Sequence, residues 1–88
     1  NVQLAQVIDR STIRVKVWER GCGVTLASGS SACAVAVASN RLGLTDGTVK
    51  INLDGGNLFV EWQQDGVWST GPTAFVFSGE ISEKYLEK

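Results

Sequence analysis

The sequence predicts one small α+β domain, with antiparallel or mixed strands wrapped around a single central buried helix. Stretches in which apolar and polar residues alternate, as in half-buried strands, flank one long segment of Ala, Val and Ser. Turn signals built on glycine separate these stretches. With 88 residues and 43% apolar content, the chain is typical of a globular domain with one small core, or of a piece of a larger protein.

The first two strands are predicted at Val2–Ile8 and Ile13–Val17. The first is rich in branched residues, and the second alternates strictly between apolar and charged side chains. Asp9–Ser11 supplies a turn between them. An antiparallel hairpin is therefore expected.

The segment from Ser30 to Leu42 is predicted to be the central helix. Its apolar residues occur on all sides rather than in one stripe, which indicates a helix surrounded by protein. A buried strand is the alternative, because valine is a weak helix former, but the length and the alanines favour a helix. Gly43 is expected just past its C-terminus.

Alternating sequence broken by glycine continues after the helix. Asp54–Asn57 (DGGN) is a strong hairpin-loop signal, and Pro72 belongs at an edge, a bend or a strand start because it has no N–H group to donate. The remaining elements are predicted as strands at Thr48–Leu53, Leu58–Trp62, Val67–Thr70 and Thr73–Phe77, then a short surface turn or helix within Glu80–Lys88.

Composition excludes several classes of function. Eight Lys and Arg residues and nine Asp and Glu residues are spread along the chain, so there is no basic stripe for nucleic acid or an anionic membrane. The sequence has no histidine, which rules out a His-based metal site and a Ser-His-Asp triad. Cys22 and Cys33 form no CxxC pair, are too few for a metal cage, and are expected to be reduced thiols.

The start of the predicted helix is a candidate binding site. Ser28, Gly29, Ser30 and Ser31 occupy this turn. The first N–H groups of a helix lack partners within it, and the helix dipole favours negative charge there, so an anionic group would be stabilised. The alternative is structural, with the Ser28 or Ser30 side chain accepting a hydrogen bond from a nearby backbone N–H as the helix N-cap.

Residues Glu19–Cys33 read ERGCGVTLASGSSAC, and an Ala/Val helix, DGG, EW, TGP and FSGE follow in that order. This arrangement resembles the C-terminal part of the diaminopimelate epimerase family over nearly the whole chain. The resemblance implies a cytoplasmic enzyme of lysine and peptidoglycan precursor synthesis that interconverts LL- and meso-diaminopimelate without pyridoxal phosphate or a metal. It also implies two pseudo-symmetric halves, each with strands around a helix and each supplying one catalytic cysteine.

The resemblance assigns substrate-binding roles to five residues. Asn1 matches an asparagine at the distal, non-reacting end of the substrate. Glu19 and Arg20 match a pair at that same end, where the carboxylate answers the distal ammonium and the guanidinium can hold the distal carboxylate through two hydrogen bonds. Gly29 and Ser30 match residues whose backbone N–H groups take the reacting carboxylate.

Ser28 stands where the family has one of its catalytic cysteines. A thiol has an ordinary pKa of roughly 8.5, which a helix N-terminus lowers, whereas an alcohol is a far weaker acid. No histidine or lysine is near in sequence to activate the hydroxyl. Ser28 is therefore expected to be a poor base that still offers a proton or a hydrogen bond. Engineered and natural origins of this serine both fit the sequence.

Family members are much longer than this chain, so residues 1–88 are predicted to be a C-terminal segment of a larger two-half protein. They form a fragment, a processed piece or one component of a split protein. The predicted partners are diaminopimelate and the missing N-terminal half. A second copy of the protein, in a homodimer, is a further candidate partner. Without the other half, one face of the substrate α-carbon is unattended, and the isolated chain is expected to be inactive.

Two alternatives remain open at this stage. One is a proline racemase or hydroxyproline epimerase-like enzyme on the same architecture, which predicts proline-type substrates. The Glu19-Arg20 motif, suited to the distal end of an amino acid, argues against it. The other is a non-catalytic ligand-binding remnant, which predicts binding without proton exchange.

Overall fold

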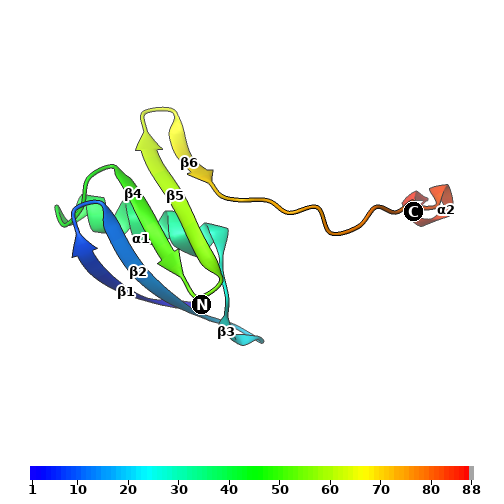
Figure 1. Ribbon diagram of the computed structural model, residues 1–88, viewed down its shortest axis with the longest axis horizontal. Coiled ribbons are helices and arrows are strands. Elements are labelled where there is room, and N and C mark those ends of the chain that lie inside the picture. Colours follow the sequence, from blue (N-terminus) through cyan, green and yellow to red (C-terminus); the bar gives the residue numbers. More distant parts are fainter. Residues whose placement is uncertain (88) are drawn as a thin grey trace.

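The computed structural model describes residues 1–87 and consists of a six-stranded mixed sheet, one helix packed on one face of it, and an extended C-terminal segment (Figure 1). The predicted α+β class is confirmed. The elements in chain order are β1 (Val2–Asp9), β2 (Thr12–Glu19), β3 (Gly23–Thr25), α1 (Gly29–Arg41), β4 (Thr48–Leu53), β5 (Gly56–Gln63), β6 (Gly66–Thr70) and α2 (Glu83–Leu86).

Strand β2 is the centre of the sheet's first part. It pairs antiparallel with β1 along its length, with Val2 opposite Trp18, and this confirms the predicted hairpin. Its other edge is shared by β4, which runs parallel to the start of β2, and by β3, which runs antiparallel to its end. Strand β3 was not predicted. It begins at Gly23, whose φ of 77°, together with the φ of 83° at Gly21, lets the chain reverse immediately after β2.

Helix α1 supplies the crossover that the parallel pairing of β2 and β4 requires. The strict alternation of the sequence places one set of side chains against the helix and the other on the opposite face of the sheet. The buried core lies between sheet and helix and consists of Ile13, Val15, Val17, Ala32, Val35, Ala36, Val49, Ile51, Leu53 and Val60.

The sheet covers only one face of α1. The buried helix residues are Ser31, Ala32, Val35, Ala36 and Ser39. Ala34 and Ala38 are exposed. The predicted helix is thus confirmed. It was predicted to be surrounded by protein, but within residues 1–87 only one of its faces is covered, because all six strands lie on one side of it. The helix ends at Arg41, and Gly43 follows with a φ of 77°, as predicted.

The chain after β6 differs from the prediction. The β4–β5 hairpin forms as expected, and β5 also pairs antiparallel with β6. The predicted strand at Thr73–Phe77 is wrong for residues 1–87, because this segment runs away from the sheet without a pairing partner (Figure 1). A strand requires a neighbouring edge for its N–H and C=O groups, and none lies beside it. Of the short surface turn or helix predicted within Glu80–Lys88, the structure shows a helix, α2; Lys88 lies outside the described residues.

Candidate functional site

The first residue of the chain is bonded to the turn that follows β2. The Asn1 Oδ1 atom accepts a hydrogen bond of 2.8 Å from the backbone N–H of Arg20. Glu19 ends β2, and its carbonyl accepts a hydrogen bond from the N–H of Cys22, which closes the turn. Neither the Glu19 nor the Arg20 side chain forms an ion pair within residues 1–87. Asn1 and the Glu19-Arg20 pair therefore lie together with both charged side chains free to bind a ligand.

The first turn of α1 carries the other predicted residues. Ser28 has an extended backbone (φ −152°, ψ 116°), and its Oγ accepts a hydrogen bond of 3.3 Å from the N–H of Ser31. Ser28 is thus the N-cap, as the structural alternative predicted. The N–H groups of Gly29 and Ser30 have no acceptor among the residues described. A Cβ placed on Gly29 would meet nothing within 4 Å, so the backbone here is open to an approaching ligand.

These two groups of residues are held at the same end of the sheet. Strand β3 pairs with the end of β2, and the chain then passes through Leu26 directly into α1. The N–H of Gly55, in the β4–β5 turn, donates a hydrogen bond of 2.7 Å to the Leu26 carbonyl and fixes this link. Sequence reasoning missed this contact, since it joins residues far apart in the chain.

The surroundings of Ser28 determine what its hydroxyl can do. Within residues 1–87 its hydrogen-bond partners are the N–H of Ser31 and the Ser30 hydroxyl, 3.5 Å away. Neither group can take a proton from an alcohol, whose ordinary pKa lies far above neutrality. The geometry supports hydrogen bonding by Ser28, and it provides no activating base. The same residues contain no cluster of three or more His, Cys, Asp or Glu side chains placed to hold a metal ion.

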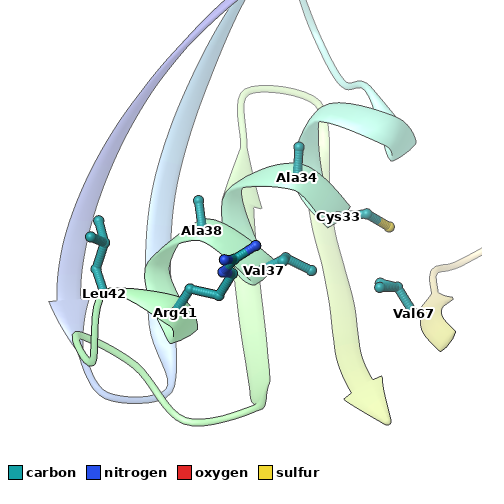
Figure 2. Close-up of a pocket in the computed structure, with 7 residues that line it drawn as sticks. All are labelled: Cys33, Ala34, Val37, Ala38, Arg41, Leu42 and Val67. Atoms are coloured by element: carbon teal, nitrogen blue, oxygen red, sulfur yellow. The ribbon is translucent and has the colours of Figure 1, made fainter. Parts of the chain in front are cut away.

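An open apolar groove lies apart from this site, along the outer face of α1. Figure 2 shows Ala34, Val37 and Ala38 on the helix, with Cys33 extending toward Val67 of β6. Arg41 and Leu42 complete the lining. None of the residues predicted to bind substrate lines the groove, so it is a separate surface. Cys22 and Cys33 are both free thiols, the first exposed and the second partly buried.

No helix within the described residues is long and apolar enough to cross a membrane.

Comparison with known proteins shows which family this chain resembles in sequence. The family model described as diaminopimelate epimerase matches residues 1–76. The chain is 52% identical to a diaminopimelate epimerase of Rhodospirillum centenum over 87 residues, which cover 98% of this chain and 30% of that protein. It is 52% identical to one from Prochlorococcus marinus, over 92% of this chain and 29% of that protein. It is 47% identical to a third, from Acinetobacter baumannii, over 99% of this chain and 31% of that protein.

These matches extend over nearly all of this chain, and the chain spans about 30% of the length of the curated relatives it matches. They give no support to the proline racemase alternative. The family model covers the whole site described above, from Asn1 through the first turn of α1. The chain belongs to the diaminopimelate epimerase family.

Proposed function

We propose that residues 1–88 form part of a two-base amino-acid epimerase that interconverts LL- and meso-diaminopimelate without pyridoxal phosphate. In such a reaction one group removes the α-proton as the C–H bond breaks, and a second group on the opposite face delivers a proton to the resulting carbanion. This chain supplies one of the two positions, at Ser28. The longer protein supplies the other.

The substrate's two ends fit the two groups of residues at this end of the sheet. Glu19 and Arg20 carry opposite, unpaired charges that match the distal ammonium and carboxylate. The unpartnered N–H groups of Gly29 and Ser30 match the reacting carboxylate, whose binding there also stabilises negative charge that develops on the α-carbon. Asn1 acts on the distal end and holds the Arg20 backbone.

The observation that carries this proposal is the match of residues 1–76 to the diaminopimelate epimerase model. Ser28 lies within the matched range and is the N-cap of α1. Side-chain chemistry then separates binding from turnover. An alcohol without a neighbouring base does not become a useful proton acceptor near neutral pH. We therefore expect the serine protein to bind diaminopimelate and not to epimerise it.

The apolar surface left bare by this chain supports its being part of a larger protein. The groove along α1 is lined by apolar side chains, and Phe75, Val76 and Phe77 are 88%, 81% and 80% exposed. Soluble proteins seldom leave contiguous apolar surface of this kind uncovered. We propose that the rest of the protein, about two thirds of the relatives' length, packs against α1 and pairs with Thr73–Phe77.

The test is exchange of the α-hydrogen of LL- and meso-diaminopimelate in deuterated water. The full-length protein with Ser28 is compared with its Ser28→Cys variant, and mass spectrometry reads deuterium separately from stereochemistry. Epimerisation by the cysteine variant alone supports the proposal. The isolated 88-residue chain, with serine or cysteine, is the control and is expected to give no exchange. A clear epimerase rate from it would contradict the two-half proposal.

A second candidate function is a binding protein that has lost catalysis. The N-cap geometry of Ser28, whose hydroxyl is hydrogen-bonded to no base within residues 1–87, favours this alternative. It predicts that both full-length versions bind diaminopimelate and that neither exchanges the α-proton. The deuterium experiment therefore separates the two candidates directly.

Three further properties stay predictions. Activity of the full-length Ser28→Cys variant without added pyridoxal phosphate, in the presence of a carbonyl-trapping reagent, tests independence from that cofactor. Fractionation of cells tests the cytoplasmic location. Sedimentation of the full-length protein tests the homodimer.

A further inference from the structure

One side-chain hydrogen bond joins β1 to α1 within the described residues. The Gln3 Nε2 atom donates to the Ser31 Oγ atom at 3.0 Å, across 28 positions of sequence. Ser31 is 3% exposed, and Gln3 is half-buried on the face of β1 that looks toward the helix. The bond is partly buried, so it defines one relative position of strand and helix more firmly than a fully exposed pair would.

Both partners of this bond are connected to the proposed site. Ser31 donates its backbone N–H to the Ser28 Oγ, so its hydroxyl and its amide belong to the same cap. Gln3 lies two residues from Asn1, whose side chain accepts from the Arg20 N–H. The beginning of β1 therefore contacts the helix start through Gln3 and the charged turn through Asn1.

A ligand with two charged ends needs the groups that bind those ends to lie at a fixed distance from each other. The backbone N–H groups of the helix start would hold one end, and the turn at Arg20 would hold the other. A small displacement of either group weakens a ligand that must satisfy both at once. Gln3 fixes the helix start to β1, and Asn1, directly before β1, is hydrogen-bonded to the Arg20 backbone. Gln3 therefore controls the distance between the helix start and the turn at Arg20.

We propose that Gln3 is a positioning residue. Acting through Ser31, it sets the first turn of α1 relative to Asn1 and Arg20, so that both ends of one amino-acid ligand are held together. This inference rests on the proposed function, because it names how the same site is kept in register. Gln3 touches no reacting atom.

The sequence contains a signal for this role. Along the helix-facing side of β1, Gln3 precedes the apolar residues Ala5 and Val7. A polar side chain thus occupies a position at which an apolar side chain would need no hydrogen-bond partner. A half-buried amide at such a position is costly unless it is hydrogen-bonded. Ser31 provides that bond.

The test uses calorimetric binding of meso-diaminopimelate to the full-length Ser28 protein, in which no turnover is expected. Gln3→Leu and Ser31→Ala should each raise the Kd about five- to tenfold, the loss expected for one hydrogen bond. The double variant should bind no more weakly than the weaker single variant, because both remove the same bond. Gln6→Leu, an exposed glutamine on the opposite face of β1, is the matched control and should leave the Kd unchanged.

A merely structural role gives a different result. It would lower the fraction of binding-competent protein, read as stoichiometry, and the thermal midpoint, while the Kd of the folded fraction stayed the same. An unchanged Kd in Gln3→Leu, or multiplied effects in the double variant, would overturn the positioning role alone. Failure of the parent protein to bind meso-diaminopimelate would overturn the proposed function and this inference with it.

Discussion

Two segments of similar composition take different structures in this protein. Thr48–Leu53 (TVKINL) and Thr73–Phe77 (TAFVF) are both rich in residues that favour strands. The first is strand β4, paired with β2 on one side and β5 on the other. The second is extended but unpaired, with its phenylalanines exposed to solvent. Strand propensity describes how well a sequence fits a pleated surface, and a neighbouring edge decides whether the strand forms. We expect the edge for Thr73–Phe77 to lie in the rest of the protein.

The largest effect in this comparison is expected for Phe77→Ala. In the full-length protein it should lower the free energy of unfolding by about 3–5 kcal/mol, because the ring would be buried against the partner of Thr73–Phe77. In the isolated chain, where Phe77 is 80% exposed, the change should stay within about 0.5 kcal/mol. Urea unfolding of both proteins measures the difference. Equal, small effects in both would show that this segment stays unpaired in the whole protein.

Ile51→Ala tests the paired strand, β4, in the same comparison. Ile51 is fully buried in the middle of β4, so its truncation should cost about 2–5 kcal/mol in the isolated chain and in the full-length protein alike. Lys50→Ala, one residue earlier on the other face of the sheet, is the control and should be nearly neutral. A cost for Ile51→Ala that appears only in the full-length protein would mean that this core does not form without the rest of the chain.

Gly55→Ala tests the link between β4 and the candidate site. A Cβ at this position would lie 3.0 Å from the Leu26 Cβ and 3.1 Å from the Leu26 carbonyl oxygen, which accepts the Gly55 N–H. The overpacking should cost about 1–3 kcal/mol and displace the segment that leads into Ser28. Gly47→Ala, whose added Cβ meets only an ordinary contact of 3.6 Å, is the matched control. Urea midpoints that fall equally for the two variants would argue against a tight approach at Leu26.

Local patterns were sufficient to predict the hairpins and the helix. Alternation predicted β2 and β4, branched residues predicted β1, and turn signals on glycine set off β5 and β6. A serine cap before the Ala-rich segment was predicted, since capping involves only neighbouring residues, and the structure places it at Ser28 and not at Ser30. The motif around Glu19-Arg20 predicted the candidate site residues, whose roles stay proposals.

The features that sequence reasoning missed all depend on distant partners. The parallel contact of β2 with β4, the short β3, and the bond from Gln3 to Ser31 join segments whose spatial relation no local pattern specifies. The wrong strand at Thr73–Phe77 has the same cause. Its composition was interpreted correctly as β-forming, but the edge it needs is not among residues 1–87.

The smallest effect, and one confined to acid, is expected from a charged cluster where β2 meets the β4–β5 turn. Arg14 and Lys16 both donate hydrogen bonds to the Asp54 carboxylate, and these bonds hold the pKa of Asp54 below its ordinary value of 3.8. Because the folded state prefers the ionised form, the cluster contributes stability above the ordinary value. That contribution is lost as the pH falls from 3.8 through the lower folded pKa.

Asp54→Asn should therefore lower the urea midpoint slightly near neutral pH and flatten its fall in acid. The flattening should be partial, because hydrogen bonds from the Ser11 N–H and hydroxyl lower the pKa of Asp9 in the same direction. Adding Asp9→Asn should flatten the acid limb further, since the two carboxylates have separate partners and their effects should add. An acid limb as steep in the double variant as in the parent would assign the acid sensitivity of this fold to other carboxylates.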